Sequence, residues 1–243
     1  MNPTLPYRRW WCALLLSSAL ACAQEVTLSA HVALVNRHSS SRTPKPGNVV
    51  LWLTPIASQA DPDPAPPSLQ PLRLVQHNKS FDPHVLVVPV GSLVEFPNRD
   101  PFFHNVFSLF EGKRFDLGLY EAGSTRKVRF DKPGISYIFC NIHAEMSAVV
   151  IALDTPYYGI SDSRGEVAIS HVPVGRYRLH IWYEEAVPDT LRALTREITV
   201  SDSDATLGTL RLATADLPLT HKNKYGRDYD PPAPTDNPAY PHP

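Results

Sequence analysis

The stretch CNIHAEM, residues 140–146, places a cysteine, a histidine and a methionine within seven positions of one another. A second histidine, His104, lies 36 residues before Cys140 in the run FFHNV. A thiolate, two imidazoles and a thioether are the ligands of a type 1 copper site. We expect His143 and Met146 to share one loop with the cysteine. The second histidine would approach them from a separate strand end, as a β-sandwich allows.

The expected roles of these four residues follow from the two oxidation states of copper. Thiolate and thioether sulfur favour Cu(I), while imidazole accepts both states. Two histidines and one cysteine in a trigonal set, with a weak axial methionine, keep the geometry similar in both states, which suits one-electron transfer. We therefore expect one copper ion, bound strongly by Cys140, His143 and His104 and weakly by Met146. Zinc fits a similar tetrahedral set and is the alternative metal.

Three residues beside the expected ligands are predicted to shape the pocket. Phe103, together with Phe102, is expected to keep water away from the metal. Asn105 directly follows the first ligand and is expected to tie the two ligand segments together by hydrogen bonding, a contact that orients ligands and tunes the potential. Ile142 and Phe103 are expected to form an apolar face beside the loop histidine, where a redox partner protein would dock.

Nearly every apolar run in the chain has the pattern of a β-strand. Residues 26–34 alternate apolar and polar or small side chains with period two, as in a half-buried strand. The 25 prolines and 11 glycines favour many short strands and turns over long helices. The sequence thus predicts an all-β protein, with a central block of strands at 84–90, 93–96, 104–107, 126–130, 135–139 and 147–153.

Four pieces of the central block occur in a specific combination. They are GSLVEFPN at 91–98, HNV at 104–106, PG at 133–134 before YIFC at 137–140, and the CNIHAEM loop. With them, residues 81–153 resemble the cupredoxin family of plastocyanin, pseudoazurin and amicyanin. The resemblance implies a Greek-key sandwich with one copper ion and an electron-transfer role. We assign residues 71–155 to this expected domain. The short spacing from His143 to Met146 is similar to the amicyanin loop, while Ile142 stands where many members have proline.

The strands on either side of the central block form a second pattern. The pieces SDSRGEV at 161–167, VPVGRY at 172–177 and LGTL at 207–210 resemble the second half of a carboxypeptidase regulatory-like, or transthyretin-like, β-sandwich. The strand at 26–35 and PGNVVL at 46–51 resemble its first half. We therefore predict a small Ig- or transthyretin-like sandwich from residues 24–58 and 156–213, with a Pro-rich linker at 59–70 and the cupredoxin inserted into it. The alternative gives residues 24–67 to the cupredoxin, and the pairing of the first strand distinguishes the two. Proteins labelled methylamine utilization protein resemble this combination.

The first 23 residues have the features of a secretory signal peptide. Arg8 and Arg9 precede a short apolar run at 10–20, and an Ala-Cys-Ala cleavage site follows. These features predict export to the periplasm. Anchoring as a lipoprotein at Cys22 is less favoured, because Ala19 stands where a lipobox usually has leucine. Cleavage leaves Cys140 as the one remaining cysteine, and a bound metal would protect this thiol in an oxidising compartment.

Charge and hydropathy argue against nucleic acid as a partner and against a membrane-spanning segment in the mature chain. Without the two arginines of the signal, 21 basic residues face 24 acidic ones, and no basic run suggests nucleic acid. No second apolar stretch has membrane-spanning length, so we expect no integral membrane segment after signal removal. Residues 214–243 are rich in Pro, Tyr, Asn and Asp, and this composition predicts a tail that is disordered or draped over the surface.

Three other functions use parts of the same evidence. A copper protein for storage, delivery or sensing would have the same ligands without an electron partner. A multicopper oxidase or nitrite reductase needs further His-x-His ligands, which the sequence lacks, so we expect no enzyme. Ser161, Asp162 and His171 provide the residue types of a hydrolase triad, but nothing like a nucleophile elbow surrounds them. A metal-free interaction module is the remaining alternative.

Overall fold

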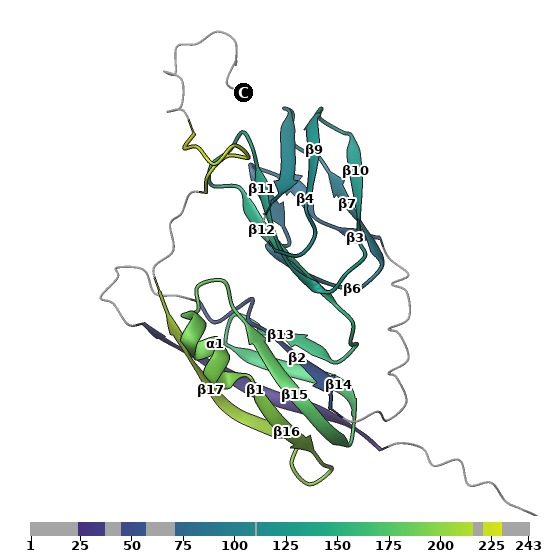
Figure 1. Cartoon of the computed structure of the whole chain (residues 1–243), viewed down its shortest axis with the longest axis vertical. Coiled ribbons are helices and arrows are strands. Elements are labelled where there is room, and N and C mark those ends of the chain that lie inside the picture. The colour runs from purple at the N-terminus through teal and green to yellow at the C-terminus, as the bar shows by residue number, and fades with distance from the viewer. Residues whose placement is uncertain (1–23, 37–44, 57–70, 110, 216–220, 230–243) are drawn as a thin grey trace, which may run out of the picture.

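The computed structural model describes residues 24–36, 45–56, 71–109, 111–215 and 221–229. Within these ranges the chain forms strands β1 to β17 and one short helix, so the all-β prediction is confirmed. Figure 1 shows two sandwiches, one above the other. The predicted signal peptide and the whole of the predicted linker lie outside the described residues. No helix of the described part is long and apolar enough to cross a membrane.

The first sandwich, here called the outer sandwich, is built from two separate parts of the chain. β1 (Glu25–Asn36) pairs antiparallel with β14 (Glu166–Pro173) and parallel with β17 (Thr206–Thr214). The facing sheet has the order β13-β2-β15-β16. Its strands are β2 (Val50–Pro55), β13 (Tyr158–Ile160), β15 (Gly175–Trp182) and β16 (Arg196–Val200).

The pairing of β1 bears on the insertion hypothesis. Among the described residues, β1 pairs only with β14 and β17 and with no strand between residues 72 and 153. The chain therefore leaves the outer sandwich after β2, forms the second sandwich, and returns at β13. Helix α1 (Pro188–Leu194), which the sequence did not reveal, lies in the outer sandwich between β15 and β16.

The second sandwich, here called the inserted sandwich, runs from residue 72 to residue 153. One sheet has the order β10-β7-β3 and the facing sheet the order β6-β12-β11-β8-β9. The small hairpin β4-β5 lies beside them. The first sheet and the hairpin contain β3 (Leu72–Arg73), β7 (Ser92–Pro97), β10 (Thr125–Phe130), β4 (Val75–His77) and β5 (Ser80–Asp82). The facing sheet contains β6 (Val85–Pro89), β8 (His104–Ser108), β9 (Phe115–Tyr120), β11 (Gly134–Cys140) and β12 (Ser147–Leu153).

The core of the inserted sandwich follows from period-two patterning. In β7, the side chains of Val94 and Phe96 are buried. Leu93, the residue before Val94, has its side chain on the opposite face of the sheet and is 43% exposed. These side chains meet Val106 and Ile138 from the facing sheet in one core cluster. β8 is buried along its whole length. A residue at the start of β8 is therefore held in the interior, which is where the first candidate ligand lies.

The two sandwiches share an apolar interface along β12. Even-numbered residues 148–152 of this strand pack into the core of the inserted sandwich, and odd-numbered residues 149–153 pack against Val50 and Trp182 of the outer sandwich. Burial on both faces explains why residues 148–153 form a continuous apolar run, where a half-exposed strand would alternate. At the edge of this interface His84 bonds to Glu184 at 2.6 Å and to the carbonyl of Ser147 at 3.2 Å.

Candidate metal centre

The candidate ligands converge at one end of the five-stranded sheet. His104 is the first residue of β8 and Cys140 is the last residue of β11. The two strands are antiparallel neighbours, with Cys140 paired to Val106. The start of one strand therefore lies beside the end of the other. His143 and Met146 belong to the loop that joins β11 to β12, as the sequence predicted.

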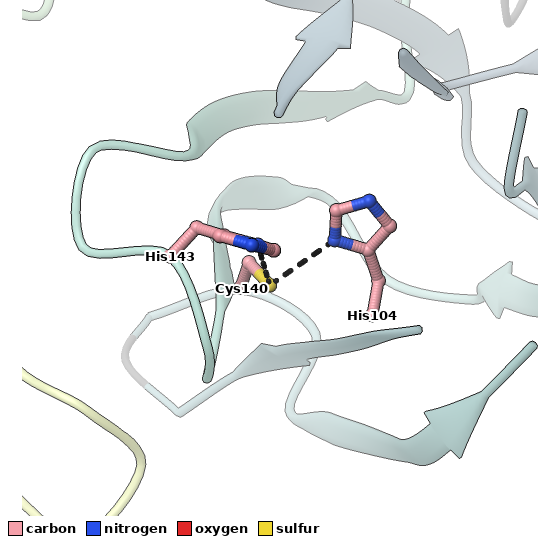
Figure 2. A group of neighbouring side chains, drawn as sticks. All are labelled: His104, Cys140 and His143. Atoms are coloured by element: carbon pink, nitrogen blue, oxygen red, sulfur yellow. Dashed lines mark hydrogen bonds between the residues drawn. The ribbon is translucent and has the colours of Figure 1, made fainter. Parts of the chain in front are cut away.

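The donor atoms of the two histidines and the cysteine lie within bonding reach of one small ion. Sγ of Cys140 is 3.5 Å from Nδ1 of His104 and 3.5 Å from Nδ1 of His143, as Figure 2 shows. All three donor atoms lie within 4.8 Å of one another. His104 and Cys140 are fully buried, and His143 is partly exposed. Among the described residues, this is the one group of three such side chains.

These spacings suit a single transition-metal ion. Typical distances of about 2.3 Å from metal to sulfur and about 2.0–2.1 Å from metal to nitrogen, at angles near tetrahedral, separate the two donors by roughly 3.6 Å. The observed separations of 3.5 Å match this value. A thiolate with two imidazoles is also the donor set that copper prefers. The residues present therefore fit the metal that the sequence implies.

Met146 lies in the same buried core cluster as Cys140. The amide of Met146 donates to the carbonyl of His143 at 3.1 Å, and the amide of Cys140 donates to the carbonyl of Met146 at 3.1 Å. These two main-chain bonds close the loop on itself. The side chain of Met146 is fully buried, and its role as a weak fourth ligand stays a prediction.

Asp100 is the main feature of the site that the sequence did not reveal. Its carboxylate accepts a hydrogen bond from Nε2 of His104 at 2.9 Å, and both residues are buried. It also accepts from the amides of Asn78 at 2.6 Å and Lys79 at 3.0 Å. Burial acts to raise the pKa of Asp100, but these amides and the His104 ring outweigh it and hold the pKa below the ordinary value. The acid is therefore ionised and can only accept.

This carboxylate fixes which nitrogen of His104 faces the cysteine. Because Asp100 accepts at Nε2, that nitrogen carries the hydrogen, and the lone pair of Nδ1 is directed at Sγ of Cys140. A carboxylate that holds the far nitrogen of a metal-binding histidine orients the ring and makes it a better ligand. Burial lowers the pKa of His104, although the bond to Asp100 opposes the shift. The neutral imidazole is the form that binds a metal.

The loop histidine and the cysteine are also tuned by burial. Burial, aided by the nearby charge of His104, lowers the pKa of His143 to about 4. Burial raises the pKa of the Cys140 thiol, although main-chain amides of Asn105, Ile142 and His143 work in the opposite direction. Without metal at neutral pH, the site therefore holds two neutral imidazoles and one protonated thiol.

Asn105 connects the two ligand segments, but mainly through its main chain. Its carbonyl accepts from the amide of Asn141 at 2.8 Å, and its amide points to the sulfur of Cys140. Its side-chain amide instead donates to Asp116 in β9 at 2.8 Å. β9 was not predicted from the sequence, because Gly118 interrupts the alternation of apolar residues in this strand. In the structure Gly118 has a φ of 66°.

The aromatic wall of the site comes from Phe102. Its ring lies 5.3 Å from the ring of His104 and 5.6 Å from that of His143. Phe103, expected to share this role, is 50% exposed, and Ile142 is 43% exposed. The chain alternates in direction here, so the first phenylalanine points inward and the second outward. The two exposed side chains are available for the apolar face that the sequence predicts.

The residues of the hypothetical hydrolase triad have other partners. The hydroxyl of Ser161 donates to the carbonyl of Pro46 at 2.5 Å. Asp162 accepts from the amides of Arg164 and Glu166 in its own turn. His171 is exposed and bonds to Glu25 at 3.0 Å. Each of the three has a structural partner of its own.

Comparison with known proteins finds similar folds among copper proteins. The chain shares 22% identity with a purple cupredoxin from Nitrosopumilus maritimus, covering 34% of this chain and 99% of that one at a TM-score of 0.32. It shares 26% identity with the Cu-containing nitrite reductase from Thermus scotoductus SA-01, covering 42% of this chain and 26% of that one at a TM-score of 0.34. A reduced amicyanin variant shares 19% identity, covering 42% and 99% at a TM-score of 0.32. No family model and no curated protein matches the sequence. At these TM-scores the similarities assign no function, so the function is argued from the site itself.

Proposed function

We propose that this chain is a periplasmic, mononuclear type 1 copper protein that transfers one electron at a time. The observation that carries the proposal is the equal 3.5 Å spacing from Sγ of Cys140 to Nδ1 of His104 and of His143. His104, Cys140 and His143 would bind the ion strongly, and Met146 would bind it weakly. Export rests on the signal-like segment 1–23, which lies outside the described residues.

The surroundings support a site that keeps its shape while the charge changes. A bound copper ion would supply the one-electron couple. Asp100 and the closed loop hold the donor atoms in place, and burial under Phe102 keeps water from them. Ligands that do not move between oxidation states lower the reorganisation cost of electron transfer. The same rigidity gives no advantage to a protein that must release its metal.

The exposed edge of the site suggests where the electron leaves. His143 is partly exposed, and Phe103 and Ile142 give an apolar surface beside it. A redox partner that docks on this surface would reach the edge of the His143 imidazole. We therefore propose that a second, unidentified redox protein binds here.

Copper titration of residues 24–243, followed by absorption, tests the proposal. We expect one equivalent of Cu(II) to give an intense blue band, and we expect Cys140→Ser to abolish this band. Asp131→Asn, a change of an exposed residue on the same sandwich, should leave it intact. Reversible one-electron reduction of the blue form would support electron transfer. Tight Cu(I) binding with no coloured Cu(II) form would favour storage or delivery and would refute the electron carrier.

A further inference from the structure

Residues 221–229 lie against the candidate metal centre, although they belong to the tail that the sequence predicted to be disordered or draped. We call this segment the C-terminal strap; it is the yellow segment beside the end of β11 in Figure 1. It follows the last strand of the outer sandwich in the sequence. The strap therefore brings the outer part of the chain to the metal-binding end of the inserted sandwich.

Three hydrogen bonds join the strap to the loop that carries the cysteine. The hydroxyl of Tyr229 donates to the carbonyl of Cys140 at 2.6 Å. The amide of Lys224 donates to Oδ1 of Asn141 at 2.9 Å. The amide of His221 donates to the carbonyl of Ala144 at 3.1 Å. The contacts are spread from one end of the loop to its middle, so they restrain its shape as a whole.

A second route joins the strap to the other ligand segment. Nζ of Lys224 donates to Oδ2 of Asp116 at 2.8 Å. Oδ1 of the same carboxylate accepts from Nδ2 of Asn105 at 2.8 Å. Asn105 directly follows His104, so this pair of bonds connects the strap to the start of β8. Both segments that supply candidate ligands are therefore attached to the strap.

The strap has a defined shape of its own. The side-chain oxygen Oδ1 of Asn223 accepts from the main-chain amides of Tyr225 and Arg227. The main-chain amide of Asn223 donates to the carbonyl of Arg227 at 2.8 Å. The ring of His221 lies 4.3 Å from the ring of Phe139, next to the cysteine. A turn closed by its own hydrogen bonds can restrain what it touches, because less chain entropy is lost when it docks.

We propose that the C-terminal strap is a positioning element of the metal centre, which holds residues 140–146 and the start of β8 in the arrangement that binds the ion. Its action on copper rests on the proposed function, whereas its action on the loop does not. The strap touches no candidate donor atom. It acts through the main chain of Cys140 and, by way of Asp116, through Asn105.

The test compares Tyr229→Phe with Tyr225→Phe in the full chain. Both changes remove one hydroxyl from the strap, but Tyr225 is 73% exposed and its side chain contacts Lys224 within the strap, not the loop that carries the cysteine. In the metal-free protein we expect Tyr229→Phe to speed hydrogen exchange at the amides of Asn141 and Met146 by about three- to tenfold, the effect of one lost hydrogen bond. Tyr225→Phe should leave these rates at the wild-type value.

A double variant, Tyr229→Phe with Lys224→Gln, tests both attachments and the effect on metal. We expect its Cu(I) affinity to fall by about tenfold or more, as for other residues that support metal ligands. We also expect the copper absorption band to shift, which loss of global stability alone would not cause. Wild-type exchange rates in both variants would overturn the proposal. Faster exchange with unchanged affinity and absorption would overturn it too, because the strap would then be only structural. Faster exchange in a protein that binds no copper in any form would uphold the strap and refute the proposed function.

Discussion

Replacement of Asp100 by asparagine gives the sharpest test of how the site is held. The carboxylate accepts from the amide of Asn78 at Oδ1 and from both Lys79 and His104 at Oδ2. An asparagine of the same shape has one acceptor oxygen in place of two. Its best orientation keeps oxygen at the Oδ2 position, which leaves its amide group facing the amide of Asn78.

The magnitude follows from these contacts. Hydrogen bonds to a charged group contribute about 1.5–3 kcal/mol each, and a buried donor left without a partner costs about 1–3 kcal/mol. One such bond is lost, and the others lose their charge. We expect Asp100→Asn to lower the free energy of unfolding of the metal-free protein by about 2–3 kcal/mol. Because the hydrogen bond that orients His104 then loses its charge, we expect copper affinity to fall by about 10–100-fold.

Two assays measure these effects. Urea unfolding of the metal-free protein gives the change in stability, and competition with a Cu(I) chelator gives the change in affinity. Asp131→Asn serves as the matched control, because Asp131 pairs with Lys113 at the surface of the same sandwich. A D100N protein that binds Cu(I) with wild-type affinity would show that the charge of Asp100 does not support His104 as a ligand, whatever its effect on unfolding.

Three further predictions concern protons and the interface between the sandwiches. Without metal, His143 and His104 are neutral above pH 6.5, and the raised pKa of Cys140 keeps its thiol protonated. Copper binding should therefore release about one proton, and the affinity for copper should rise about tenfold for each unit of increase in pH. Calorimetry in buffers of different ionisation enthalpy measures this number, and release of two protons would contradict it. The folded protein binds fewer protons than the unfolded chain between pH 6.5 and about 4, because the pKa of His143 is lowered to about 4. The metal-free protein should therefore lose stability as the pH falls through this range, and urea midpoints that stay constant would count against it. Trp182→Ala should lower the free energy of unfolding by about 3–5 kcal/mol, because Trp182 is buried against β12. The copper absorption band should persist in this variant. Loss of the band would show that the interface between the sandwiches shapes the site.

The strands could be predicted where apolar side chains alternate, and the candidate ligands could be placed on one loop where they are closely spaced in the sequence. The strands that carry His104 and Cys140 were predicted from apolar runs, because their burial depends on local pattern. The loop from Cys140 to Met146 was predicted from spacing alone. The two-part outer sandwich was expected from a resemblance to the regulatory-like sandwich, and β1 pairs with β14 and β17 and not with the inserted strands.

The features that escaped prediction depend on contacts between distant residues. Asp100 lies in a turn-like stretch rich in Pro and Asn, and only the fold brings its carboxylate to His104. The strap is polar and proline-flanked, and its composition predicted a tail that is disordered or draped over the surface. Composition could not show that Tyr229 reaches a carbonyl 89 positions away. Phe102 points toward the two histidines and Phe103 points outward. Which of two adjacent phenylalanines points inward depends on the backbone conformation, and the sequence alone does not give this.

The path of the chain also has a consequence for how this protein folds. β1 pairs Glu25 with Pro173 and Ser29 with Thr206, so the outer sandwich closes loops of more than a hundred residues. Pairings between such distant residues slow folding, because the entropy of loop closure is lost before the contacts form. The inserted sandwich is continuous from residue 72 to residue 153, so its pairings span far fewer residues than those of β1. If it folds first, it brings β2 and β13 close together and shortens the remaining search. The unit that carries the candidate metal centre would then also serve as the nucleus on which the rest of the protein assembles.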